Sequence, residues 1–275
     1  MVKGHRIGQD RRRPLTSRVR TPMIGKSCSI ATSHGVMDAY VAHPEDRACP
    51  LVVLFMDIWG LREELFAIAR RVAAEGYYCV VPNLFHREGK FDLARRHPDG
   101  RTMSFDLLPE DVRRDMQARA ERLDRHTLRA DAAAILEFCA HEPVRAGPAG
   151  SIGFCMGARE AFFAAQEFPE RFRATASLHG SRLVTEADDS PHRFAHRMRG
   201  EVYCGFAEFD RSAPPAVIAE IEKALHATPG LTCRTQIHRG ARHGYALPDR
   251  DVHDAAATES DWREIFAMLR RQLAS

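Results

Sequence analysis

A cysteine between two glycines stands where a short apolar run gives way to a helix-forming segment. Gly153-Phe-Cys155-Met-Gly157 follows the run at 149–153 and precedes an alanine-rich stretch at 158–165. This is the pattern of a nucleophile elbow, G-x-[nucleophile]-x-G, with Cys in place of the more common Ser. Glycines are needed because side chains at those positions would collide in so sharp a turn. The first amides of the helix would stabilise a thiolate and a neighbouring oxyanion. We therefore predict that Cys155 is a nucleophile.

Two later residues complete a triad in the chain order nucleophile, acid, base. Asp210 ends the segment 204–210, and His243 lies in Gly240-Ala-Arg-His243-Gly-Tyr245. Both follow predicted strands, at the edge of a parallel sheet where active sites collect. His243 would take the thiol proton or hold the thiolate in an ion pair, and Asp210 would fix the imidazole tautomer. The structural alternatives, a helix-capping Asp and a surface-loop His, do not account for the joint order and context.

Alternating strands and helices must position these residues. We expect a hairpin at 28–41 that turns at Ser33-His34-Gly35, because Gly supplies the turn. We then expect strands at 51–56, 77–82, 149–153, 174–179, 201–206 and 231–237, and helices at about 61–75, 131–140, 156–167, 214–227 and 259–273, with a further helix from about Pro109. Short unbroken apolar strands separated by helices are typical of parallel β-α-β units.

The pattern predicts one doubly wound α/β domain, with a mostly parallel central sheet and helices on both faces. The segment 88–130 is the least regular part, and its Arg, Asp and Glu residues and the loop Pro98-Asp99-Gly100 suggest an excursion that arches over one edge of the sheet. A hydrophobic fraction of 44% and a charged fraction of 28% exclude a disordered chain.

Charge is concentrated at the start of the chain. The 275 residues carry a net charge of +3, but residues 1–26 hold +7 and the rest hold −4. No apolar run follows Arg11-Arg12-Arg13, so we expect no secretory signal. Without interleaved aromatic residues, these bases indicate neither a nucleic-acid nor a membrane partner. We expect residues 1–26 to form a flexible basic tail and residues 27–275 to form a single domain.

Cysteine and histidine spacing predicts no metal site. The seven cysteines are an odd number without a C-x-x-C pair, which indicates reduced thiols and a cytoplasmic location. Apart from Cys155, we expect them to pack as small apolar residues. His192 and His196 are four residues apart but lie among Arg and Asp without a third ligand, so a solvated surface is expected. Phosphate- and dinucleotide-binding glycine motifs are absent, and we expect no cofactor.

Residues 27–273 resemble the dienelactone hydrolases, which are α/β-hydrolases with a Cys-Asp-His triad. The likeness rests on the elbow and on five further segments, Met56-Asp-Ile-Trp-Gly-Leu61, Glu75-Gly-Tyr77, Val81-Pro-Asn-Leu-Phe-His-Arg87, Asp210-Arg-Ser-Ala-Pro214 and His243-Gly-Tyr245. The resemblance implies an α/β-hydrolase fold in which Cys155 is the nucleophile, Asp210 the triad acid and His243 the base.

The resemblance also implies roles for residues around the triad. The backbone N–H groups of Ile58 and Met156 match the oxyanion hole. Asp57 matches a family Glu that pairs with the resting thiol and activates it. Arg87 matches a family Arg that binds the substrate carboxylate. Trp59 is expected to border the pocket, where it would either pack in the protein or form a wall for an apolar substrate.

The chain departs from the family pattern near the pocket. Asp57 is one methylene shorter than the family Glu, and a solvated loop carboxylate is the alternative to thiol activation. Asn83 and Phe85 stand where the family often has Asp and Tyr. Leu247 stands four residues after His243, where dienelactone-cleaving members have a second carboxylate-binding Arg. The loss of one cation favours thiol-dependent hydrolysis in general over cleavage of an anionic dienelactone.

The expected function is hydrolysis of a small ester or lactone through an acyl-enzyme on Cys155. The expected partner is this small-molecule substrate, and the expected state is a monomer or a weak homo-oligomer. One alternative is another reaction on the same scaffold, such as thioesterase, peptidase or dehalogenase chemistry, because a fold does not fix a function. Another is a small-molecule binder that has kept the pocket without the catalysis.

Overall fold

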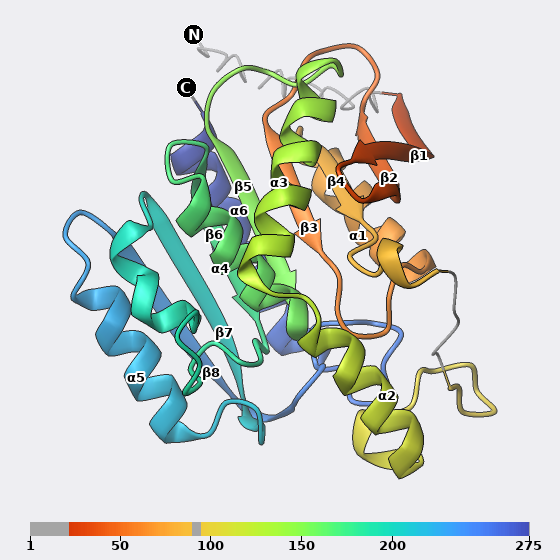
Figure 1. Cartoon of the computed structure of the whole chain (residues 1–275), viewed down its shortest axis with the longest axis vertical. Coiled ribbons are helices and arrows are strands. Elements are labelled where there is room, and N and C mark those ends of the chain that lie inside the picture. Colours follow the sequence, from red (N-terminus) through yellow and green to blue (C-terminus); the bar gives the residue numbers. More distant parts are fainter. Residues whose placement is uncertain (1–21, 90–94, 275) are drawn as a thin grey trace, which may run out of the picture.

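The computed structural model describes residues 22–89 and 95–274, which build one central sheet (Figure 1). Its eight strands lie in the order β1-β2-β4-β3-β5-β6-β7-β8. β1 and β2 form an antiparallel pair at one edge, β2 is also antiparallel to β4, and the strands from β3 to β8 run parallel. The strands are β1 Met23–Thr32, β2 Gly35–Pro44, β3 Leu51–Phe55, β4 Tyr78–Pro82, β5 Ala149–Phe154, β6 Phe172–Leu178, β7 Glu201–Phe209 and β8 Thr232–Arg242.

Helices cover both faces of this sheet. In Figure 1, α3, α4 and α5 lie on one face and α1 and α6 on the other. The helices are α1 Glu63–Ala74, α2 Glu110–Glu121, α3 Arg125–Ala140, α4 Met156–Glu167, α5 Pro215–His226 and α6 Ala255–Leu273, with short 3₁₀ turns at His86–Glu88, Phe105–Leu107 and Pro191–Arg197. Every residue of β3, β4 and β5 is buried, as expected for strands covered on two faces. The predicted α/β-hydrolase architecture is confirmed.

Two helices start earlier in the structure than the sequence pattern predicts. α3 begins at Arg125 rather than near residue 131, because the Asp124 side chain accepts a hydrogen bond from the Thr127 N–H at 2.7 Å. α6 begins at Ala255 rather than near residue 259, and Asp254 caps it in the same way. The first turn of α3 is mostly polar and that of α6 consists of small residues, so in both helices the apolar periodicity begins later than the helix.

The predicted basic tail extends too far. β1 starts at Met23 and pairs with β2 from Met23↔Pro44 onward, so residues 23–26 belong to the sheet. Their backbone is paired although most of their side chains are exposed, which an apolar pattern does not reveal. The rest of the predicted tail, residues 1–21, lies outside the described residues. Within the described part of the chain, no helix is long and apolar enough to cross a membrane.

The irregular segment crosses the carboxyl end of the sheet rather than one of its edges. The Thr102 N–H donates to the Asp249 carbonyl at 2.7 Å, and the Asp251 N–H donates to the Thr102 carbonyl at 3.2 Å. The predicted helix from about Pro109 is confirmed as α2. Beside the loop after β3, this segment builds a second small apolar cluster, which consists of Trp59, Leu108 and Met116 with Ile58, Met103, Phe105 and Val112 packed against it.

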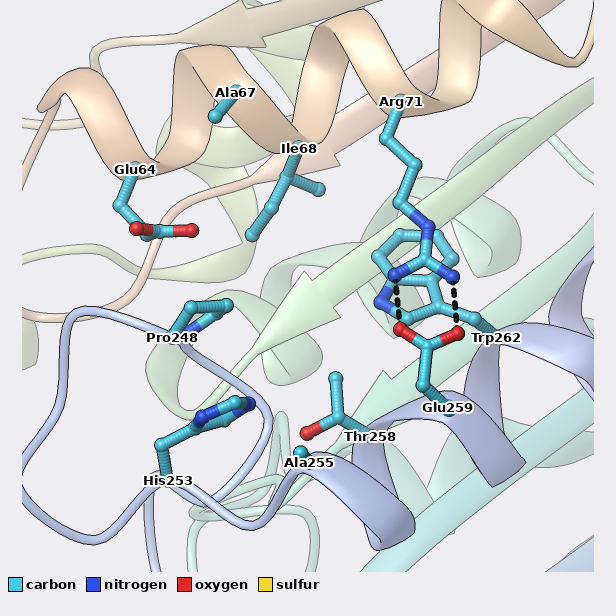
Figure 2. A pocket seen from close by; sticks show the side chains of 10 residues that line it. All are labelled: Glu64, Ala67, Ile68, Arg71, Pro248, His253, Ala255, Thr258, Glu259 and Trp262. Carbon is cyan, nitrogen blue, oxygen red and sulfur yellow. Dashed lines mark hydrogen bonds and ion pairs between the residues drawn. The ribbon is translucent and has the colours of Figure 1, made fainter.

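A shallow cavity of about 220 Å³ opens on the face of the sheet that α1 and α6 cover. It lies between α1, the start of α6 and the loop before α6 (Figure 2). The Arg71 guanidinium crosses it to the Glu259 carboxylate with two hydrogen bonds of 2.7 Å. The same guanidinium lies 4.9 Å from the ring centroid of Trp262. The residues that line the cavity are Glu64, Ala67, Ile68, Arg71, Pro248, His253, Ala255, Thr258, Glu259 and Trp262. None of the predicted site residues is among them.

Candidate active site

Cys155 occupies the turn between β5 and α4 in a strained backbone conformation. Its φ of 53° is rare for a residue other than glycine and marks a backbone that the surrounding structure holds in place. A Cβ atom at Gly153 would collide with the backbone of Gly157, and one at Gly157 would collide with the carbonyls of Phe55 and Met56. The steric reason for both glycines is therefore confirmed, and α4 starts directly after the sulfur-bearing residue.

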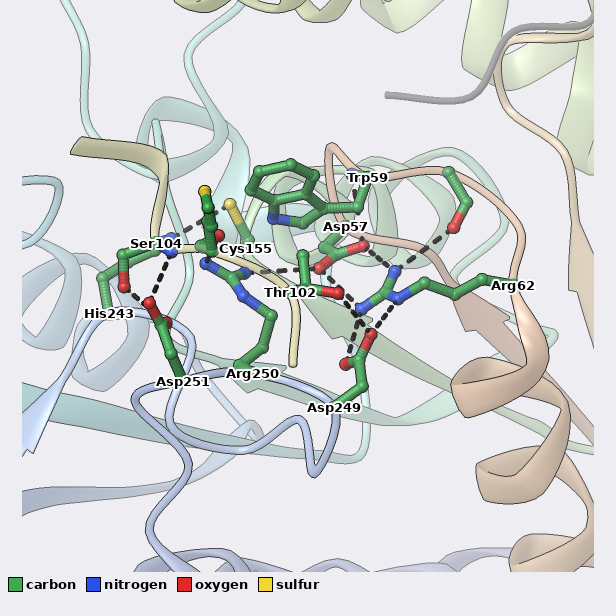
Figure 3. Close-up of polar contacts among 12 residues, drawn as sticks. Asp57, Trp59, Arg62, Thr102, Ser104, Cys155, His243, Asp249, Arg250 and Asp251 are labelled. Atoms are coloured by element: carbon green, nitrogen blue, oxygen red, sulfur yellow. Dashed lines mark hydrogen bonds and ion pairs between the residues drawn. The ribbon is translucent and has the colours of Figure 1, made fainter. Parts of the chain in front are cut away.

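The structure brings the three predicted triad residues together. The Nε2 atom of His243 lies 3.0 Å from the Sγ atom of Cys155, and its Nδ1 atom lies 2.7 Å from Oδ2 of Asp210. Oδ1 of Asp210 accepts a hydrogen bond from the Ser212 N–H at 2.7 Å, which fixes the carboxylate. The Asp210 side chain is fully buried, whereas that of His243 is 24% exposed. The base is thus held on one side by Asp210 and is partly exposed to solvent, and Figure 3 shows its contact with Cys155.

Electrostatics favour a charged His243. Burial lowers the pKa of this imidazole, but the adjacent Cys155 sulfur and the hydrogen bond to Asp210 outweigh burial and raise the pKa from 6.5 to about 10. At neutral pH His243 therefore carries a positive charge beside the Cys155 sulfur, where an imidazolium favours the thiolate form of a cysteine. Such a pair can attack a carbonyl carbon and then supply a proton to the leaving group.

Two residues after β6 belong to the site but were missing from the sequence predictions. The Ser181 N–H donates to the Cys155 carbonyl at 3.0 Å, and the Ser181 hydroxyl lies 3.8 Å from the Cys155 sulfur. His179 is fully buried and sets its ring edge-on to that of His243, with centroids 5.1 Å apart. Burial and the nearby charge of His243 hold the pKa of His179 well below its ordinary value, so it stays neutral. Their place at the carboxyl end of the strand beside β5 was the available signal.

The two predicted oxyanion-hole donors lie just after strand β3 and at the start of helix α4, which are in contact with each other. Ile58 follows β3, Met156 opens α4, and the α4 backbone at Gly157 packs against the end of β3. Among the described residues, no hydrogen bond from either N–H to a protein acceptor is recorded. Met156 is the first residue of its helix, where the N–H has no acceptor within the helix. In the described part of the chain both N–H groups are therefore without a protein acceptor, as the predicted role requires.

Asp57 does not pair with the thiol. Its side chain is fully buried, and Arg62 donates to it twice, from Nη1 at 2.5 Å and from Nη2 at 3.1 Å. Nη1 of Arg250 lies 3.8 Å from the same carboxylate, and the Trp59 N–H donates to it at 3.3 Å. Within the described ranges, no hydrogen bond joins the Asp57 carboxylate to the Cys155 sulfur. The predicted pairing of Asp57 with the thiol is not found, and Asp57 is not a solvated carboxylate either, because two guanidinium groups hold it inside the protein.

Arg87 is also turned away from its predicted role. Its guanidinium donates to both carboxylate oxygens of Asp131 on α3, at 2.7 and 2.9 Å. His86 contacts the same buried carboxylate at 3.2 Å. Burial alone would raise the pKa of Asp131, but His86 and Arg87 lower it, so the carboxylate stays charged and holds the arginine. The prediction that Arg87 binds a substrate carboxylate is wrong in this structure because a protein carboxylate has taken that place.

Trp59 packs within the protein instead of lining an open pocket. The residue is only 4% exposed, lies against Leu108 and Met116, and carries the Arg250 guanidinium 5.0 Å from its ring centroid. The packing interpretation is confirmed, and contact with substrate is not. Leu247, at the position of the missing family Arg, is fully buried.

The remaining candidates show no metal site. In the part of the chain that the structure describes, no group of three or more His, Cys, Asp or Glu side chains could hold a metal ion. His192 and His196 fall in a 3₁₀ turn, where residues four apart do not share a face, and His192 is engaged with the Ser190 hydroxyl at 2.8 Å. All seven cysteines are free thiols, and those other than Cys155 are buried or half-buried, as predicted.

Comparison with known proteins gives a consistent picture. The sequence pattern of the dienelactone hydrolase family matches residues 37–273. A "putative carboxymethylenebutenolidase" of Synechocystis sp. is 25% identical over 228 residues, which cover 82% of this chain and 87% of that protein.

Two solved structures share the fold. The crystal structure of a "putative dienelactone hydrolase" from Klebsiella pneumoniae subsp. pneumoniae matches with a TM-score of 0.75 at 22% identity, covering 90% of this chain and 99% of that one. A dienelactone hydrolase-like promiscuous phosphotriesterase from metagenomic libraries matches with a TM-score of 0.70 at 18% identity, covering 91% and 98% of the two chains.

Proposed function

The chain belongs to the dienelactone hydrolase family, whose members are hydrolases of ester and lactone bonds, and we propose that it cleaves a small ester or lactone through a thioester on Cys155. The observation that carries this proposal is the contact of 3.0 Å between His243 Nε2 and the Cys155 sulfur, with Asp210 fixing the other ring nitrogen at 2.7 Å. Each member of the triad has the partner that nucleophilic catalysis requires.

In the first half-reaction the Cys155 thiolate attacks the carbonyl carbon of the substrate. The carbonyl oxygen becomes an oxyanion, which accepts hydrogen bonds from the N–H groups of Ile58 and Met156. Collapse of this intermediate breaks the carbon–oxygen bond to the leaving group. The leaving alkoxide takes the proton from Nε2 of His243, which leaves a neutral imidazole and an acyl-thioester.

In the second half-reaction water replaces the thiol. Neutral His243 removes a proton from the water as it attacks the thioester carbonyl, and the same two N–H groups hold the oxyanion. Collapse breaks the carbon–sulfur bond and releases the carboxylic acid. The thiolate and the imidazolium are restored, and no group is oxidised or reduced in the cycle.

The surroundings favour an uncharged acyl group. Arg87 is neutralised by Asp131, Leu247 is apolar, and Arg250 is buried between Asp57 and Trp59. An anionic substrate would therefore meet no free arginine at these positions. Because a thiol nucleophile needs a reducing environment, we place the protein in the cytoplasm and take a small molecule as its partner.

The test compares wild-type protein with Cys155→Ala on a panel of activated esters, lactones and thioesters. The wild type should hydrolyse esters or lactones, and Cys155→Ala should lose about 10⁴- to 10⁶-fold in kcat because the triad acts as a unit. The thermal midpoint should change little, because the variant loses one sulfur atom from a side chain that is only partly buried. Full activity of Cys155→Ala would contradict the proposal. Hydrolysis of thioesters alone would indicate a thioesterase. A protein that hydrolyses none of these substrates, although Cys155 can be alkylated, would be a non-catalytic binder.

A further inference from the structure

A buried network of charges joins three segments around the active site. Arg62 binds Asp57 with two hydrogen bonds and also binds Asp249, from Nε at 2.7 Å and from Nη2 at 3.2 Å. The Thr102 hydroxyl donates to Asp249 at 3.1 Å. The side chains of Arg62, Asp57 and Asp249 are 8%, 0% and 12% exposed. We call Asp57, Arg62 and Asp249 the charge clamp (Figure 3).

Each part of the charge clamp sits beside a part of the catalytic machinery. Asp57 is adjacent in sequence to Ile58, the oxyanion-hole donor that follows β3. Asp249 lies in the loop that begins at His243, and backbone hydrogen bonds from Leu247 to Gly244 and from Arg250 to Leu247 make this loop a tight turn. Arg62 therefore connects the oxyanion loop to the loop of the catalytic base.

Arg62 and Asp249 stabilise each other's charge within the clamp. Burial lowers the pKa of Arg62, but Asp57 and Asp249 outweigh burial and raise it above its ordinary value. Burial raises the pKa of Asp249, but the hydrogen bonds and charge of Arg62 lower it below its ordinary value. Arg62 and Asp249 therefore keep their charges near neutral pH, and the ion pair between them persists there.

Stability alone does not explain such a network. Buried ion pairs are often no more stabilising than apolar side chains of the same volume, because desolvation offsets the attraction. A guanidinium that forks onto two carboxylates instead imposes a fixed distance and plane on the segments that carry them. That geometry is useful where a backbone N–H must face a reacting atom, since a displacement of about 1 Å can reduce a rate by about 100-fold.

We propose that Arg62 is a positioning residue that holds the Ile58 N–H in register with Cys155 and His243 by bridging Asp57 and Asp249. The inference rests on the proposed thiol hydrolysis and adds to it a residue for which neither the motif pattern nor the resemblance gave a role. It also replaces the predicted role of Asp57, which acts on the loop backbone and not on the thiol.

The test is Arg62→Lys, because an ammonium keeps the charge but cannot fork onto both carboxylates. We expect kcat for a p-nitrophenyl ester to fall about 10- to 100-fold, with a smaller change in KM. The rate and pH profile of Cys155 alkylation by iodoacetamide should match the wild type, because alkylation uses the thiolate without an oxyanion hole. Arg71→Lys is the matched control, since it breaks a two-bond pair between α1 and Glu259 of α6 that lies away from the triad, and it should leave all these values unchanged.

Asp249→Asn gives a second test that does not depend on the folding of the lysine variant. It keeps the shape of the side chain, removes its charge and should reduce kcat with the same unchanged alkylation profile. Wild-type kcat in a folded variant, a shifted alkylation profile, or failure of both variants to fold would overturn the positioning role. Failure of the proposed function is distinguishable, because Cys155→Ala would then remain active whatever the clamp variants do.

Discussion

Two His–Asp pairs lie close together in this protein, and only one of them has the surroundings of a catalytic pair. His243 contacts Asp210 at 2.7 Å, and His238 contacts Asp261 at 2.6 Å. The second nitrogen of His243 faces the Cys155 sulfur at 3.0 Å and the side chain is 24% exposed. The second nitrogen of His238 lies 3.5 Å from the Gln236 amide and the side chain is 6% exposed.

The carboxylates differ in the same way. Asp261 also accepts hydrogen bonds from the hydroxyls of Tyr203 and Tyr245, both at 2.6 Å, so its acceptor sites are occupied by fixed protein donors. Asp210 receives one backbone N–H besides the imidazole. The distance within a His–Asp pair therefore does not identify a catalytic pair. What identifies it is a reactive atom on the far nitrogen and a path to solvent.

The largest contrast should come from removing the charge of Asp210. Asp210→Asn should lower kcat about 10⁴-fold, because the amide allows the wrong imidazole tautomer. It should also reduce the free energy of unfolding, because charged His243 loses its buried carboxylate partner. Ester hydrolysis and thermal unfolding measure the two effects. Kinetics like those of the wild type would show that His243 does not depend on Asp210.

The second-largest effect should be seen in the pH dependence of ester hydrolysis, which depends on the charge of His243. The pKa of His243 is raised from 6.5 to about 10, so its stabilising charge is fully present below pH 6.5 and is lost as the pH rises through 10. For an alkyl ester, whose leaving group needs a proton, kcat/KM should fall above about pH 10. Asp210→Asn should move this alkaline limb to lower pH. An alkaline limb near pH 6.5 in the wild type would contradict the imidazolium–thiolate arrangement.

The reverse outcome is expected at the second pair. Asp261→Asn replaces one acceptor oxygen with a donor and leaves at least one buried partner unpaired, which should reduce the free energy of unfolding by about 1–3 kcal/mol. Denaturant titration measures this loss, and kcat should stay near the wild-type value. A loss of kcat as large as that of Asp210→Asn would make this pair part of the catalytic machinery.

The smallest effect concerns Arg87. Arg87→Lys breaks the two-bond contact with Asp131 and should reduce the free energy of unfolding by about 1–2 kcal/mol. KM should change equally for a neutral ester and for an ester that carries a carboxylate. A rise in KM confined to the anionic ester would restore the substrate-binding role.

The meeting of Cys155, Asp210 and His243 was predictable because its signals are local. Gly153 and Gly157 mark the elbow around Cys155, and Asp210 and His243 each follow an apolar run that reads as a strand. The order of the three in the chain then selects the fold. These features depend on neighbouring residues and not on which side chains meet across the molecule.

The surrounding contacts were not predictable, because they join residues that are far apart in the chain. Asp57 is bound by Arg62, whose other partner is Asp249, and Arg87 is bound by Asp131 on a helix that begins earlier than its periodicity suggests. A resemblance carries residue types from one protein to another without their partners. An arginine at a matching position therefore predicts a charge there, but not whether that charge is free.

The most direct test of the account is to trap the acyl-enzyme. Wild-type protein would be mixed with p-nitrophenyl acetate, quenched in acid during turnover, digested and examined by mass spectrometry. We expect one acetyl group on the peptide that contains Cys155, labile to hydroxylamine, and none in the Cys155→Ala protein. Acetylation elsewhere with Cys155 unmodified, or turnover without an acyl intermediate, would contradict the assignment of Cys155 as the nucleophile.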